Sequence, residues 1–237
     1  TKSGLFTSEA TGEVINVSIQ EYPKYYYVKD STKFWIEDIS EYYEKSDMLL
    51  YSTDTFTLKN GIKAYRFNLR DTGSSRTITR MAMLKDNYSF SLITMGDTLS
   101  AESSFINDFF FIFKPAEKKL GRDIYENRLD EFFTDLFSKD SATQKKAQQS
   151  ITNLYYGEKG VPKIAAAISR LNLSDKEYFD SKSKLIAELG YIKDTTKPVV
   201  VNLLKKIFEQ TADTNLFQNQ VFKALARHKT KAAYQLF

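Results

Sequence analysis

Residues 56–67, FTLKNGIKAYRF, contain the strongest indication of fold in this chain of 237 residues. Apolar and polar side chains alternate on both sides of Asn60-Gly61, a pair that is favoured in two-residue hairpin turns because both residues must adopt positive φ. A turn of this length places Phe56 opposite Tyr65 on the neighbouring strand. The stretch therefore predicts two antiparallel strands.

Two further turns extend this hairpin into a meander. A five-residue turn at 71–75 pairs Phe67 with Thr79, and a turn at Asp86-Asn87 pairs Met83 with Phe90. A slip of one residue would reverse the faces of a strand, so the register can be tested against the apolar pattern. The three turns together predict one apolar face made by Phe56, Leu58, Tyr65, Phe67, Leu69, Met81, Met83, Phe90 and Leu92.

The flanking residues complete an α+β domain over residues 1–115. Further strands are predicted at 14–22 and 48–52, and a helix is predicted at 31–43. Another helix follows Ser100. The side chains expected on the buried faces of the two helices are Phe34, Trp35, Ile36, Tyr42 or Tyr43, and Phe105, Phe109 and Ile112.

Four arginines meet on the second face of the sheet in this register. Arg70 lies opposite Arg76, and Arg66 lies opposite Arg80. Like charges that face each other destabilise a sheet unless carboxylates or a bound anion neutralise them. We therefore expect a site for an anion or an acidic partner. The alternative is that the arginine side chains extend into solvent or pair with acids of a covering helix.

Beyond Pro115 the pattern changes to that of stacked helices. Leu154, Leu189 and Leu225 recur at intervals of 35 and 36 residues within similar short motifs, a spacing typical of repeated helix pairs. Capping boxes are predicted at Ser141 to Gln144 and Ser174 to Glu177, Pro198 is expected in a first helical turn, and Gly157, Gly160 and Gly190 are expected to interrupt helices. The helices are predicted at about 122–138, 141–156, 161–170, 175–190, 197–210, 214–227 and 229–237.

Two resemblances accompany these patterns. Roughly residues 10–115 resemble the PsbP-like family in the order of their elements. The resemblance rests on the stretch 56–67, two further strands, and a helix that carries Phe105 and Phe109 to Phe113. This resemblance implies a non-enzymatic domain that binds or supports partners, often outside the cytoplasmic membrane. The run 185–194 resembles the start of a HEAT-type repeat, with echoes at 151–166 and 222–237. That resemblance implies a helical-repeat domain over residues 116–237 that holds a partner.

Composition narrows the classes of function. Hydrophobic residues make up 42% of the chain and aromatic residues 14%, which predicts packed cores, and no apolar run approaches the length of a membrane span. The absence of cysteine excludes disulfides, thiolate nucleophiles and cysteine-based zinc sites. Residues 1–115 carry a net charge of −2 and residues 116–237 one of +6, but lysines alternate with acids along the helices, so we expect no nucleic-acid partner.

No set of residues predicts a catalytic or metal site. His228 is the single histidine and is expected at a surface turn, whereas a metal site needs several converging ligands. The motif from Ser181 to Lys184 matches a Ser-x-x-Lys pattern, but the partner motifs of penicillin-recognising enzymes are absent. We predict no catalytic residue, no metal and no cofactor.

A cluster of acids and a run of tyrosines can each be interpreted in two ways. The acids Glu37, Asp38, Glu41 and Glu44 are interpreted as the water-facing side of a helix, the alternative being a catalytic or Ca²⁺ role. The run 25–27 consists of three tyrosines, which we interpret as half-buried residues beside a strand rather than as an exposed adhesive patch.

The sequence as a whole predicts a non-enzymatic binding or scaffolding protein. A protein partner would be held by the helical array or by its junction with the sheet domain. The alternatives are an accessory segment of a larger exported enzyme, or a carboxylate-dependent hydrolase. The chain starts at Thr1 and ends at Phe237 within a helical pattern, so we interpret it as a mature protein or part of a longer one. A bacterial periplasmic or exported location is favoured over a cytoplasmic one, and the sequence does not define the oligomeric state.

Overall fold

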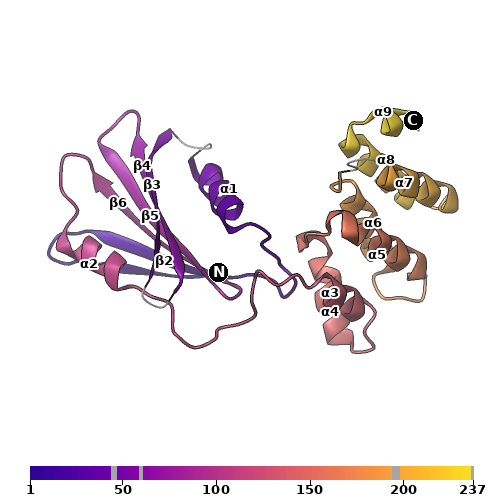
Figure 1. The fold of residues 1–237 in the computed structure, drawn as a ribbon, viewed down its shortest axis with the longest axis horizontal. Coiled ribbons are helices and arrows are strands. Elements are labelled where there is room, and N and C mark those ends of the chain that lie inside the picture. Colours follow the sequence, from indigo (N-terminus) through magenta and orange to yellow (C-terminus); the bar gives the residue numbers. More distant parts are fainter. Residues whose placement is uncertain (44–46, 59–60, 194–197, 236–237) are drawn as a thin grey trace. The chain divides into compact units, whose positions relative to one another are not determined.

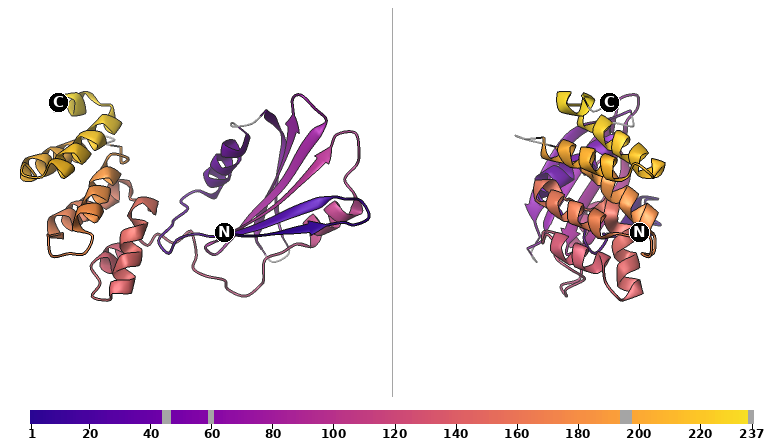
Figure 2. Two further views of the ribbon diagram at one scale, coloured as in Figure 1. Left: turned by 180° about the vertical axis from the view of Figure 1, so that it is seen from behind. Right: turned by 90° about the vertical axis from the view of Figure 1, so that its right-hand side faces the viewer.

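The computed structural model describes residues 1–43, 47–58, 61–193 and 198–235. Contacts divide the chain into a first unit, Thr1–Glu126, and a second unit, Asn127–Phe237, whereas the sequence predicted the division after Pro115. The difference arises because Ile124 is buried in a core of the first unit. The α+β class is confirmed: an antiparallel sheet with helices is followed by a segment that is helical in its described part (Figures 1 and 2).

The first unit contains one six-stranded sheet with the strand order β1-β2-β6-β5-β4-β3, in which all neighbours are antiparallel. β1 was not predicted; it and β3 form the two edges. The strands are β1 (Lys2–Thr7), β2 (Val14–Glu21), β3 (Met48–Thr57), β4 (Lys63–Asp71), β5 (Arg76–Lys85) and β6 (Tyr88–Asp97).

The predicted register is right for one hairpin. Met83 pairs with Phe90 in the β5–β6 hairpin, as the sequence predicted. In the β3–β4 hairpin, however, Phe56 pairs with Ala64 instead of Tyr65. The turn after Leu58 is one residue longer than predicted, because the Leu58 N–H donates to the Ile62 carbonyl at 2.8 Å. Gly61 lies in the left-handed region at φ +79°, whereas Asn60, the other residue of the predicted turn, lies outside the described residues, as does Lys59.

The β4–β5 pairing is also displaced by one residue. Phe67 lies opposite Arg80 rather than Thr79, and Arg70 lies opposite Thr77 rather than Arg76. The Asp71 carboxylate accepts a hydrogen bond from the Gly73 N–H at 2.9 Å, so the aspartate shapes the turn.

This shift splits the predicted apolar face into two. Ala64, Met81, Met83, Phe90 and Leu92 face α2 (Ser104–Ile112), which contributes Ile106 and Phe110 to their core. Tyr65, Phe67, Ala82 and Leu84 face α1 (Ser31–Tyr43), which contributes Trp35 and Ile39. The single-face prediction is therefore wrong: the sheet is covered by a helix on each side (Figure 1).

Helix α1 begins at Ser31 as predicted, and its described part reaches Tyr43, but its buried stripe differs in part from the prediction. Trp35 is 3% exposed and lies in the core, whereas Ile36 is 59% exposed. Phe34 and Tyr43 pack at the margin of that core. The side chain of Tyr42 lies outside the described residues.

The second unit is built from successive helices. The second helix of each of three pairs begins at Ser141, Tyr178 and Asn215, an interval of 37 residues in both cases. Leu189 and Leu225 are buried in two of these helices, but Leu154 is extended and follows a 3₁₀ turn. The helices are α3 (Leu129–Leu136), α4 (Ser141–Ser150), η1 (Ile151–Asn153, the 3₁₀ turn), α5 (Gly157–Arg170), α6 (Tyr178–Leu189), α7 (Val199–Gln210), α8 (Asn215–His228) and α9 (Lys231–Tyr234).

The predicted capping boxes are corrected by the structure. Asp140, not Ser141, caps α4, because its carboxylate accepts from the Thr143 N–H at 2.8 Å. The box that was predicted at Ser174 does not cap α6, since that helix starts later and its N-cap residue is Glu177 at φ 56°.

Pro198 and two of the three glycines lie at helix ends, whereas the third glycine lies inside a helix. Pro198 is the N-cap residue of α7, next to its predicted place. Gly157 starts α5 and Gly190 ends α6. Gly160 lies inside α5 rather than interrupting it.

Candidate functional site

The four arginines of the predicted anion site do not meet. Because of the register shift, Arg66 lies opposite Met81 on the α2 face of the sheet, whereas Arg80 lies opposite Phe67 on the α1 face. The facing pairs on which the anion-site prediction depended are therefore absent.

Each arginine is held by another group. Arg66 binds Glu102 through both carboxylate oxygens, at 2.8 Å each. Arg80 pairs with Asp38 of α1 at 2.8 Å, and Arg76 pairs with Asp71 at 2.8 Å. The Arg70 guanidinium lies 3.4 Å from the centre of the Tyr51 ring. These contacts support the alternative interpretation, in which arginines pair with acids that include one from a covering helix.

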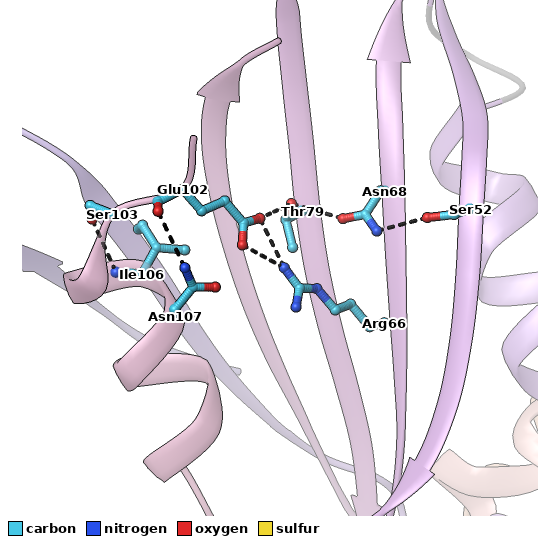
Figure 3. Close-up of polar contacts among 8 residues, drawn as sticks. All are labelled: Ser52, Arg66, Asn68, Thr79, Glu102, Ser103, Ile106 and Asn107. Carbon is cyan, nitrogen blue, oxygen red and sulfur yellow. Dashed lines mark hydrogen bonds and ion pairs between the residues drawn. The ribbon is translucent and has the colours of Figure 1, made fainter. Parts of the chain in front are cut away.

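A polar network joins the sheet to the start of α2 (Figure 3). The Thr79 hydroxyl of β5 lies 3.2 Å from the Glu102 carboxylate and 2.9 Å from Oδ1 of the Asn68 side chain, so it donates to one of them at a time. Asn68 in turn donates to the Ser52 hydroxyl at 2.8 Å. The network crosses from β3 to the segment that precedes α2 and fixes the position of Arg66.

The first turn of α2 has its own cap. The Ser103 hydroxyl accepts from the Ile106 N–H at 3.3 Å, and the Asn107 side chain donates to the Glu102 carbonyl at 3.2 Å (Figure 3). Capping at this position satisfies backbone donors that have no partner inside the helix. The start of α2 is thus anchored, and the helix is held over the sheet.

A cavity of about 690 Å³ lies on the same face of the sheet and is here called the α2 groove. Its lining is mainly apolar, and two apolar residues at the C-terminal end of α2 are largely exposed, Phe111 at 80% and Ile112 at 70%. The lining residues are Phe56, Thr57, Leu58, Arg66, Met81, Asn107, Asp108, Phe110, Phe111, Ile112, Phe113 and Lys114.

Few charged groups line the α2 groove. Arg66 is bound to Glu102, and its guanidinium lies 5.7 Å from the centre of the Phe110 ring. Lys114 pairs with Glu117 at 3.4 Å, and both side chains are largely exposed. An apolar cavity with a small number of polar groups is typical of a binding site.

The acidic cluster considered as a catalytic or Ca²⁺ site does not converge in its described part. Glu37 is 3.6 Å from Lys33 on the surface of α1, and Asp38 pairs with Arg80. The side chain of Glu41 and all of Glu44 lie outside the described residues. Among the residues that the structure describes, no three or more acids, histidines or cysteines form a group that could hold a metal ion.

The structure also locates the tyrosine run, Ser181 and His228. Tyr26 and Tyr27 are half-buried, as the sequence predicted, whereas Tyr25 is 2% exposed and so more buried than predicted. Ser181 is fully buried in α6. His228 is the last residue of α8 rather than a surface turn residue, and its Nε2 lies 3.1 Å from the Leu189 carbonyl oxygen.

Sequence reasoning missed Glu188, a buried acid in α6. Glu188 is only 8% exposed. Burial raises the pKa of its carboxyl from 4.5 to about 7, although the nearby positive charge of Arg227 acts to lower this pKa. Burial and this carboxylate also raise the pKa of the Tyr156 phenol. The available signal was an acid directly before Leu189 in an otherwise apolar helical stripe.

A second cavity of about 480 Å³ lies at the ends of α6 and α8 and is lined by several basic residues. Arg227 stacks over the Tyr191 ring at 4.5 Å. The Arg227 guanidinium lies 3.5 Å from the Ala187 carbonyl oxygen at the end of α6, where a cation is stabilised by the helix dipole, and His228 lies beside the Leu189 carbonyl group. These two basic residues thus have a structural role, which makes this cavity a weaker candidate than the α2 groove.

Comparison of the chain with models of known protein families and with curated proteins finds no match. The PsbP-like and HEAT-type resemblances therefore remain predictions. Within the described part of the chain, no helix is both long enough and apolar enough to span a membrane.

Proposed function

We propose that this chain is a non-enzymatic binding protein and that the α2 groove contacts a protein partner. The observation that carries the proposal is the apolar cavity beside two exposed residues, Phe111 and Ile112. Removing such side chains from water contributes about 1.5–3 kcal/mol each, so a partner that covers them gains substantial affinity.

The helical unit supports the same class of function. Regularly spaced helix pairs form extended surfaces that commonly hold partners. Several apolar side chains of this unit are exposed, among them Leu173 at 77% and Tyr191 at 64%. Partner binding by the helical array, which the sequence predicted, stays a proposal beside the better-defined α2 groove.

The alternatives have less support. A carboxylate-dependent hydrolase needs paired acids in a cavity, whereas the lining of the α2 groove includes one acid, Asp108. An accessory segment of a larger exported enzyme is compatible with a binding role. We therefore place partner binding first.

The proposal is tested by selecting peptides from a displayed random library against the whole chain. Selected peptides should contain apolar residues and should bind Phe111→Ser about tenfold more weakly, because an apolar contact of this size is lost. Leu99→Ser is the matched control, since Leu99 is 86% exposed and does not line the α2 groove. Selected peptides that bind both variants equally well would place the binding surface elsewhere and refute the role of the groove.

A further inference from the structure

The edge strand β3 directs part of its backbone away from the sheet. The Leu58 N–H donates to the Ile62 carbonyl, so this pair is hydrogen-bonded. Hydrogen-bonded and non-hydrogen-bonded pairs alternate along an antiparallel ladder. Asp54 and Phe56 therefore point their backbone groups toward β4. Thr53, Thr55 and Thr57 instead direct theirs to the edge, where the strand order of the described residues places no further strand.

This part of β3 has few of the features that protect sheet edges. Proteins commonly block edges with lysines, prolines or bulges. The bulge in β3 is confined to the step between Leu50 and Ser52. From Ser52 to Thr57 the strand is regular and contains neither lysine nor proline, and Asp54 is its single charge.

The same strand borders the α2 groove. Phe56 and Leu58 line the groove, and the pairing of Phe56 with Ala64 places both on the α2 face. Phe56 is 38% exposed. A strand added at the β3 edge would place every second side chain on this face, beside Phe56 and Leu58, where these side chains would cover the open side of the groove.

The charges favour a basic residue in such a strand. Asp54 is exposed on the α2 face, opposite Arg66, whose Nη2 donates to both carboxylate oxygens of Glu102. Asp108 lines the groove as a second acid. Opposite charges directly across a pair of strands stabilise the pair.

We propose that the β3 edge accepts an extended peptide of a protein partner as a seventh strand, with apolar residues opposite Phe56 and Leu58 and a lysine or arginine opposite Asp54. The added strand is antiparallel to β3, as are all neighbours in this sheet. Backbone hydrogen bonds to the three threonines supply affinity, and the groove and Asp54 supply specificity. This inference rests on the proposed binding function and names the class of ligand.

The test uses the acetylated and amidated heptapeptide Leu-Thr-Val-Thr-Lys-Thr-Ser, whose first, third and fifth residues oppose Leu58, Phe56 and Asp54. Amide hydrogen exchange of the whole chain is followed by NMR with and without the peptide. The amides of Thr53, Thr55 and Thr57 should gain protection, whereas that of Phe56 should change little because it already bonds to β4. A bound peptide that protects none of the three threonine amides would overturn the proposal.

Affinity for the fluorescently labelled heptapeptide gives a second test. Thr55→Pro removes one outward N–H and should weaken binding about fivefold, and proline is tolerated on an edge strand. Thr55→Ala keeps the N–H and should change affinity by about twofold at most. Replacing the peptide lysine by glutamate should weaken binding to the unmodified chain. Equal affinities of the proline and alanine variants would contradict strand addition.

The outcomes separate this inference from the proposed function. Library peptides that lose affinity with Phe111→Ser but show no protection at the threonines would retain the α2 groove and refute the added strand. Absence of heptapeptide binding would also refute the added strand. The proposed function fails only if the selected peptides are insensitive to Phe111→Ser.

Discussion

Replacement of Glu188 by glutamine tests whether this buried acid reduces stability at high pH. Burial raises the pKa of the Glu188 carboxyl from 4.5 to about 7 in the folded protein. The folded protein therefore holds a proton that the unfolded chain releases between pH 4.5 and pH 7. The free energy of unfolding is highest below this window, falls through it and levels off above it.

The size of the effect follows from the shift in pKa. A shift of one pKa unit corresponds to about 1.4 kcal/mol. Ionisation of Glu188 therefore lowers the free energy of unfolding of the helical unit by at most about 3 kcal/mol. Glutamine carries no charge at any pH. We expect the Glu188→Gln variant to match the unmodified chain below pH 4.5 and to exceed its free energy of unfolding by up to about 3 kcal/mol above pH 7.

Urea denaturation at both ends of this pH range measures the difference. Far-UV circular dichroism follows mainly the helices, whereas the fluorescence of Trp35, the only tryptophan, reports on the first unit. The fluorescence transition should not respond to the substitution and serves as an internal control. A variant that shows no gain above pH 7, or the same gain below pH 4.5, would refute the reasoning.

Three further predictions concern stability. A double-mutant cycle with Arg66→Met and Glu102→Gln should give a coupling energy of about 0.5–1 kcal/mol by urea denaturation, because Nη2 of Arg66 donates to both Glu102 oxygens but the pair is partly exposed. Additive effects would contradict this prediction. Gly190→Ala should destabilise the second unit by about 1–3 kcal/mol in thermal circular dichroism, since the new Cβ would lie 2.8 Å from the Ala224 Cα. Gly61→Val should cost about 1–3 kcal/mol by Trp35 fluorescence, because φ is +79° there, and unchanged stability would argue against this turn geometry.

The sequence by itself determined the features that depend on local interactions. Helix α1 begins at Ser31 as predicted, and the β5–β6 register is right because a two-residue turn leaves little freedom in how the strands pair. The spacing of leucines correctly indicated successive helices, although Leu154 lies outside them. Period and turn chemistry are encoded in neighbouring residues, so they can be interpreted without tertiary contacts.

Only the tertiary structure decided which residues share a face. The one-residue displacement between β4 and β5 moves Tyr65 and Phe67 to the α1 side, and this choice depends on the two helices that cover the sheet. Arg66 meets Glu102 across 36 residues of sequence, a contact that no local pattern encodes. The α2 groove and the burial of Glu188 likewise arise from the packing of elements, because a cavity or a shifted pKa depends on what surrounds a side chain.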